Sequence, residues 1–155
     1  MIEIEVINKL IELVNSLDNF EVNYTQKTTL GKCNVEIYLL DNNSNLVVNY
    51  ENSNISNNSS SLNLVLVCKM ITKKGNSFEL KSLKEQYEYA NKLKYAISTN
   101  ALTLEDTFVI NDSINLEVLE CSFGNINMQY STIDNNEMIF SLTTTFNYNY
   151  RFVNA

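Results

Sequence analysis

The stretch MIFSLTTTFNYNYRF, residues 138–152, decides the fold of this 155-residue chain. Its even-numbered positions carry Met, Phe, Leu, Thr, Phe, Tyr, Tyr and Phe, whereas polar side chains hold the odd positions from Ser141 to Arg151. Because successive side chains of a strand point to opposite faces, this alternation predicts one long strand. About 15 residues at about 3.3 Å each span about 50 Å, whereas a compact domain of this length has a radius of gyration near about 15 Å. We therefore expect the strand to bend through a bulge, or its aromatic end to leave the domain and need a partner.

Shorter alternating patterns on the N-terminal side of this strand predict a mainly antiparallel sheet. The run LNLVLVCKMI, residues 62–71, is apolar on both faces, which is typical of a central strand with a helix over one side. The sequence DNN at residues 134–136 favours a hairpin turn before the long strand. The other predicted strands are residues 20–25, 33–39, 46–50, 114–118 and 126–131, with a short extended piece at 78–80 and turns at 28–32 and 41–44.

Two amphipathic helices are predicted at about 2–17 and 83–98, so the fold class is α+β, with the sheet packed against both helices. A capping-box pattern, S-x-x-E, begins at Ser82 and marks the start of the second helix. We expect a single domain over residues 1–155, with a mobile polar loop at 51–61, where the sequence is ENSNISNNSSS. The apolar stripes are Ile7, Leu10, Ile11, Val14 and Leu17 on the first helix, and Leu83, Tyr87, Ala90, Leu93 and Ile97 on the second.

The composition argues against several classes of function. The formal net charge is −7 and only two basic residues are adjacent, Lys73 and Lys74, which disfavours specific nucleic-acid binding because that affinity comes mainly from clustered Lys and Arg. No apolar run approaches the roughly 18 residues that span a membrane, and the N-terminus lacks the features of a signal peptide. We therefore expect no membrane partner.

The sequence shows no recognisable catalytic apparatus. It contains no His, the commonest proton shuttle and metal ligand, and its three glycines form no phosphate-binding motif. Cys33, Cys68 and Cys121 lie in separate apolar runs and are predicted to be buried, reduced thiols. Glu117 and Glu120 are three residues apart, so a regular strand would point them to opposite faces. We therefore predict no catalytic, cofactor-binding or metal-binding residues, and no enzymatic activity.

The order of the predicted elements resembles the tail terminator (tail completion) proteins of tailed phages and phage-tail-like contractile particles. The resemblance covers most of the chain and is architectural. It is carried by the opening helix VINKLIELV at 6–14 and by the closing strand IFSLTTTFNYNYRF at 139–152. It implies a structural subunit of a ring, usually hexameric, that caps the tail tube and joins it to sheath or neck proteins. Such a protein is made in the bacterial cytoplasm and ends in the virion or particle.

Two segments are candidates for the interface of such an assembly. The alternatives to a tail terminator are another small tail, baseplate or neck assembly subunit, and a soluble acidic adaptor or secretion-type chaperone, which is usually a dimer. Oligomeric mass distinguishes the chaperone from the ring subunit. The candidate interface residues are Glu51, Asn52, Asn54, Ile55, Asn57 and Asn58 in the polar loop, and Phe146, Tyr148, Tyr150, Arg151 and Phe152 in the last strand.

Overall fold

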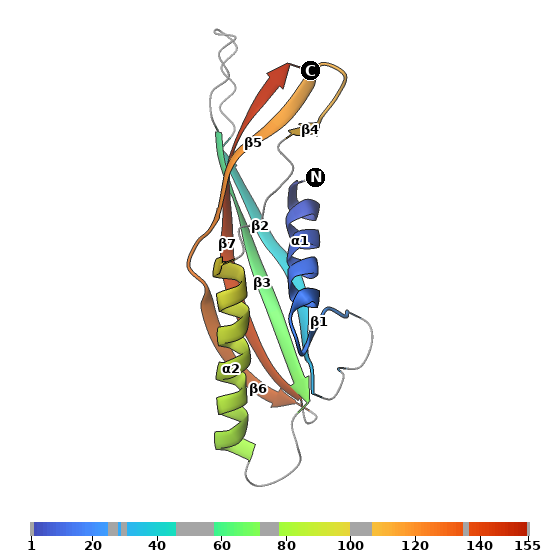
Figure 1. The fold of residues 1–155 in the computed structure, drawn as a ribbon. Coiled ribbons are helices and arrows are strands. Elements are labelled where there is room, and N and C mark those ends of the chain that lie inside the picture. The colour runs from blue at the N-terminus through green and yellow to red at the C-terminus, as the bar shows by residue number, and fades with distance from the viewer. Residues whose placement is uncertain are drawn as a thin grey trace.

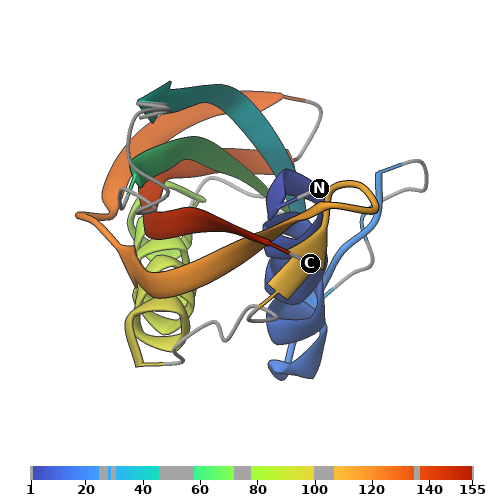
Figure 2. The same ribbon diagram turned by 90° about the horizontal axis from the view of Figure 1, so that it is seen from above.

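The fold is built from two helices and seven strands in the residues that a computed structural model describes, namely 2–24, 28, 31–45, 58–71, 78–99, 107–134 and 137–154. Both helices lie on one side of a curled sheet (Figures 1 and 2), which confirms the predicted α+β class. In chain order the elements are α1 (Ile2–Ser16), β1 (Phe20–Glu21), β2 (Cys33–Asn45), β3 (Asn58–Ile71), α2 (Phe78–Thr99), β4 (Thr107–Val109), β5 (Ile114–Phe123), β6 (Asn127–Asp134) and β7 (Glu137–Asn154).

The sheet is organised around its two longest strands, β3 and β7. The strand order is β1-β2-β3-β7-β5-β4, and β6 also pairs with β7. All of these pairs are antiparallel except β1 with β2. Strand β7 pairs with β3 along one edge, while β5 and β6 share the other edge, β5 near the C-terminal end and β6 near the start. The long strand is therefore stabilised by partners from its own chain.

The long strand neither bends through a bulge of its own nor leaves the domain, so both expectations for it are wrong. The pairing of β7 with β3 runs without a register shift from Glu137 to Tyr150, so β7 itself contains no bulge against this partner. Its end also stays in the sheet, because Asn154 pairs with Ile114. The irregularities lie in the neighbouring strands β2, β5 and β6 instead. The pairing of the two central strands is therefore regular, and the bulges lie in the strands beside them, nearer the sheet edges, where bulges are most common.

The core lies between the sheet and the two helices. Even-numbered residues of β7 face the core as predicted, with Phe140, Leu142 and Phe146 at most 1% exposed. Along α1 the fully covered positions are spaced by four residues, Ile2, Val6, Leu10 and Val14, while Ile7, Ile11 and Leu17 of the predicted stripe are only partly buried. In α2 the stripe is confirmed at Ala90, Leu93 and Ile97, but Tyr87 is exposed.

Several predicted boundaries are wrong because pairing and helix propensity extend the elements. The predicted turn at 41–44 belongs to β2, which continues to Asn45 beside β3. The predicted strand at 20–25 is only two residues long, and β4 was not predicted as a strand. Helix α2 begins at Phe78 and so includes the segment predicted as extended, since Glu79, Leu80 and Lys81 all favour a helix. The predicted strand at 46–50 lies outside the described residues.

The cysteines are not all buried as predicted. Cys33 and Cys68 are buried thiols on the core face, whereas Cys121 is exposed in β5. Burial raises the pKa of Cys68 well above its ordinary value, and its proximity to Cys33 adds to the effect. The same cause, burial, raises the pKa of Tyr148. No helix in the described ranges is long and apolar enough to span a membrane.

We expect the stability of the protein to fall at alkaline pH. The thiol of Cys68 and the phenol of Tyr148 are neutral when protonated. Their raised pKa values mean that the folded protein holds these protons more tightly than the unfolded chain does. Their contribution is complete below the ordinary values of 9.0 for the thiol and 10.0 for the phenol, and is lost as the pH rises above them. Urea unfolding between about pH 8 and about pH 10.5 measures this loss. A constant midpoint over that range would contradict it.

Candidate functional site

The aromatic residues predicted as an interface form a row inside the core. The rings of Phe146, Tyr148, Tyr150 and Phe152 contact one another in series, with centroids 5.7–6.1 Å apart. Phe123 of β5 extends the row, 5.1 Å from Phe146. The first three are at most 6% exposed and Phe152 is partly buried. The row therefore stabilises the C-terminal half of the sheet from within.

Residues 58–61 of the predicted polar loop belong to strand β3. Residues 51–57, which include Glu51, Asn52, Asn54, Ile55 and Asn57, lie outside the described residues. Asn58 is the first residue of β3, pairs with Tyr150 and is only 6% exposed. Residues 58–61 are strand residues because β7 pairs with all four and β2 pairs with 59–61 at the start of β3, which outweighs the weak strand propensity of Asn and Ser.

Arg151 lies on the opposite side of the sheet, which we call the polar face and which carries Asn63, Thr143, Thr145, Asn147 and Asn149. Its guanidinium donates a hydrogen bond to the carboxylate of Glu117 on the neighbouring strand β5, at 2.9 Å. Glu120 accepts a hydrogen bond from Asn149 on the same face, at 3.1 Å.

The prediction that Glu117 and Glu120 point to opposite faces is wrong. The pairing of β5 with β7 shifts between Val118 and Glu120, so Leu119 is an extra residue that restores both carboxylates to one face. Each carboxylate already has a partner in the sheet, Arg151 or Asn149. In the part of the chain that the structure describes, no group of three or more His, Cys, Asp or Glu could hold a metal ion.

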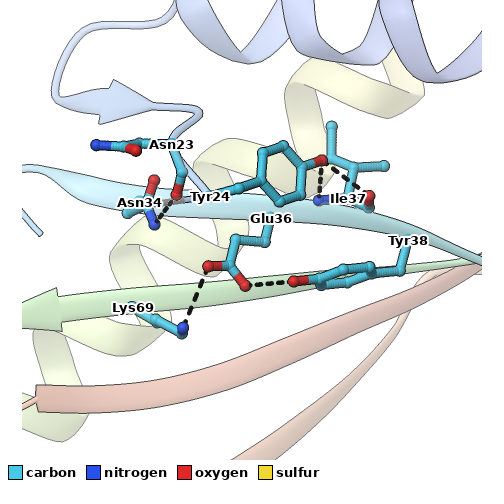
Figure 3. Close-up of polar contacts among 7 residues, drawn as sticks. All are labelled: Asn23, Tyr24, Asn34, Glu36, Ile37, Tyr38 and Lys69. Atoms are coloured by element: carbon cyan, nitrogen blue, oxygen red, sulfur yellow. Dashed lines mark hydrogen bonds and ion pairs between the residues drawn. The ribbon is translucent and has the colours of Figure 1, made fainter. Parts of the chain in front are cut away.

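The outer edge of β2 is held by a tyrosine side chain. Strand β1 pairs only with Cys33 and Asn34, and no other described strand lies beside β2 on that side. The hydroxyl of Tyr24 then donates to the carbonyl of Ile37 at 2.8 Å and accepts from its N–H at 2.9 Å (Figure 3). We call this contact the Tyr24 clamp. It gives the backbone N–H and carbonyl of Ile37 hydrogen-bond partners, as a neighbouring strand would.

Removing the Tyr24 clamp is expected to loosen the edge. Tyr24→Phe should lower the free energy of unfolding by about 1 kcal/mol, because the hydrogen bonds to Ile37 are exchanged for water at a partly exposed site. The amide of Ile37 should exchange its hydrogen faster. Urea unfolding and native-state hydrogen exchange measure the two effects. Tyr95→Phe, at a side chain 72% exposed, is the matched control and should change neither.

A buried carboxylate holds Tyr38 at the same edge. Glu36 is 7% exposed, accepts from the Tyr38 hydroxyl at 2.7 Å and pairs with Lys69 of β3 at 3.2 Å (Figure 3). The hydrogen bond to Glu36 is the largest cause that raises the pKa of Tyr38. The Tyr38 ring also meets Tyr24 edge to face, with centroids 5.8 Å apart. This network holds the outer edge of β2 in place just before Leu39 and Leu40.

Directly after this network, β2 exposes a short apolar segment. Tyr38 is 42% exposed, Leu39 36% and Leu40 61%. The pairing with β3 shifts between Leu39 and Asp41, so Leu40 is the extra residue of a bulge, and it lines an open hollow beside Asn63 and Thr143. We call residues 38–40 the β2 edge segment. None of its side chains is charged.

A second apolar segment lies at the opposite end of the strand order. Strand β4 pairs with β5 on one side only, and no described strand lies on its other side. Phe108 is buried in the core and anchors the strand, while Val109 is 70% exposed, Ile110 42% and Ile114 37%. Residues 107–110, the β4 edge segment, are also uncharged. The two edge segments belong to different strands, but both expose apolar, uncharged side chains.

In two open hollows lined by described residues, the ionisable groups form no catalytic arrangement. In the hollow of about 260 Å³, Asp41 is the single ionisable lining residue and accepts from Asn63, which in turn accepts from Thr145. The hollow of about 370 Å³ is bordered by Glu120, which Asn149 engages, and by the exposed Cys121.

The two edge segments were missed by the sequence interpretation. The predicted strand 33–39 ends at Leu39, and no strand is predicted around Val109. One signal was present for the first edge and for β5, since Leu39-Leu40 and Val118-Leu119 place two apolar residues in succession within alternating strands. Compared with known proteins, the chain matches no family model and no curated relative.

Proposed function

We propose that this chain is a structural ring subunit of the kind that caps a phage-type tail tube and joins it to sheath or neck proteins. The observation that carries the proposal is the pair of unlike edges, the β2 edge segment and the β4 edge segment, at opposite ends of one sheet. A contact between two different surfaces of identical subunits is heterologous, and such contacts generate rings when the rotation closes. The architecture that resembles tail terminators supplies the biological setting.

The net charge limits where two copies could meet. Each copy carries a formal net charge of −7, so copies repel one another over most of their surface. Soluble proteins commonly guard sheet edges with Lys, with inward-pointing charges, with bulges or with very short edge strands. The two edge segments have no Lys and no charge, but β2 has a bulge at Leu40 and β4 is only three residues long. An assembly made through uncharged edges would leave the acidic surface facing solvent, where it favours solubility.

The proposal is tested by measuring mass with light scattering over a wide concentration range, followed by negative-stain imaging with and without purified tail tubes. Rings in solution, or rings seated on tube ends, are the expected result. A protein that stays monomeric at every concentration and never binds tubes would rule the function out. A tight dimer that ignores tubes would favour the adaptor or secretion-type chaperone instead.

A further inference from the structure

We infer that the smaller of the two hollows, about 260 Å³ in volume, is a binding site for one ring of an uncharged saccharide. It lies on the polar face of the sheet, and we call it the Asp41 hollow. The inference goes beyond the proposed ring function and does not depend on it, because the hollow is formed within a single copy. Its lining includes Leu40, Asp41, Asn63, Asn125, Asn127 and Thr145.

The Asp41 hollow exists because four segments that are far apart in the chain meet on one face. The central strands β3 and β7 form its floor, and the bulge of β2 places Leu40 on one side. Asn125 and Asn127, around the start of β6, form the other side. Figure 2 shows β2 and β6 on the side of the central strands that faces away from the helices. The two flanking strands therefore border the polar face where the hollow lies.

One side of the hollow is held in place by a chain of hydrogen bonds. Oγ1 of Thr145 donates to Oδ1 of Asn63 at 2.8 Å, and Nδ2 of Asn63 donates to Oδ1 of Asp41. These bonds orient the amide and the carboxylate before any ligand arrives, which lowers the entropy that is lost on binding. An ionised carboxylate has about four lone-pair positions, so one bond leaves Asp41 able to accept from the hydroxyls of a ligand.

The opposite side of the hollow offers side-chain amides. Asn125 and Asn127 are exposed, and neither amide is engaged by another described residue. The hydroxyl of Thr143 donates to the backbone carbonyl of Asn127 at 3.5 Å, which connects this side to the floor. Each side-chain amide provides N–H donors and a carbonyl acceptor. The hollow therefore presents both donors and acceptors to a ligand.

A sugar ring has the chemistry that this lining recognises. Sugar hydroxyls donate and accept, as do the amides and the Thr hydroxyls around them, and the C–H groups of the ring suit Leu40, which is 61% exposed. The volume lies below the roughly 300–1,000 Å³ of sites for drug-sized ligands, so it suits a single small ring.

The charges of the hollow disfavour two other classes of ligand. An anion would be repelled by the carboxylate of Asp41, and none of the described lining residues is Lys or Arg. A calcium ion takes about 6–8 oxygen ligands, mostly from several carboxylates and carbonyls, whereas Asp41 is the single carboxylate of the lining. An uncharged ligand that is rich in hydroxyl groups remains.

Saturation-transfer NMR with uncharged trisaccharides tests the inference, whether or not the protein assembles. The probes are maltotriose, cellotriose, mannotriose and the trimer of N-acetylglucosamine. At least one should bind saturably with a Kd on the order of 1 mM, because the hollow is open and holds one ring. Trigalacturonic acid, which carries carboxylates, should bind at least about tenfold more weakly, because Asp41 repels it.

A substitution in the hollow tests where the sugar binds. Asn127→Ala should raise the Kd about tenfold, because it removes a hydrogen-bonding amide but keeps the backbone carbonyl that Thr143 contacts. The side chain is exposed, so the urea midpoint should not change. Asn91→Ala, at an exposed position of α2, is the matched control and should bind like the wild type.

Three results would overturn the inference. The first is that no trisaccharide binds saturably at concentrations up to about fifty times the expected Kd. The second is equal binding of trigalacturonic acid, which would show that Asp41 does not face the ligand. The third is an unchanged Kd for Asn127→Ala, which would place the sugar elsewhere. Ring formation is measured separately by light scattering, so its failure would reject the proposed function and leave the saccharide site standing.

Discussion

Phe140→Ala is expected to lower the free energy of unfolding by about 3–5 kcal/mol, the usual range for removing a fully buried aromatic side chain. Phe140 has no exposed surface and lies on β7, between Cys68 of β3 and Tyr130 of β6 in register. Helix α2 packs against β7, so the missing ring would leave a cavity that three elements must close together. The unfolding midpoint in urea measures the loss.

Tyr95→Ala is the control for Phe140→Ala, because it removes a ring of similar size from the exposed side of α2. Its side chain is 72% exposed, so we expect a change of no more than about 0.5 kcal/mol. A loss below about 1 kcal/mol for Phe140→Ala would contradict the placement of this ring at the centre of the core.

Thr144→Val is expected to have the opposite sign and to raise the free energy of unfolding by about 1–3 kcal/mol. Thr144 is 4% exposed on the core face of β7, and its buried Oγ1 has no hydrogen-bond partner among the described residues. A buried polar atom without a partner costs about its desolvation free energy, and a methyl group of the same shape avoids that cost. Val also favours a strand.

The control for Thr144→Val is Thr145→Val, one residue further along the same strand. Thr145 faces the polar side and its Oγ1 donates to Asn63 at 2.8 Å, so its replacement should destabilise the protein by about 1 kcal/mol. Opposite signs for two adjacent Thr→Val changes would locate the two faces of β7 experimentally. A loss of stability on Thr144→Val would show that its hydroxyl has a partner.

The existence and type of the main elements follow from local patterns in the sequence. The period-two alternation at residues 138–152 and the helical spacing of Leu10 and Val14 record which side of each element is buried. These patterns depend on residues close together in the chain, so they predict α+β, two helices and a central pair of strands without knowledge of the neighbours. They also predict that the even-numbered side chains of β7, with the aromatic row among them, share one face.

The candidate site was only partly predictable for the same reason. Arg151 and the aromatic residues of the last strand were selected from their sequence, but whether they meet a partner or the core depends on β5, which lies about 30 residues away in the chain. The polar segment at 58–61 became strand because two neighbours pair with it. Local propensity contains no information on such neighbours.

By itself, the sequence determined the periodicities, and therefore which side chains can share a face within each regular stretch. The tertiary structure alone decided which strands lie at the edges and that Leu40 and Leu119 form bulges. It also decided that the hydroxyl of Tyr24 hydrogen-bonds to the backbone N–H and carbonyl of Ile37. The physical reason is that edges and bulges are properties of hydrogen-bond ladders between distant segments. A single segment specifies only the alternation that those ladders then shift or preserve.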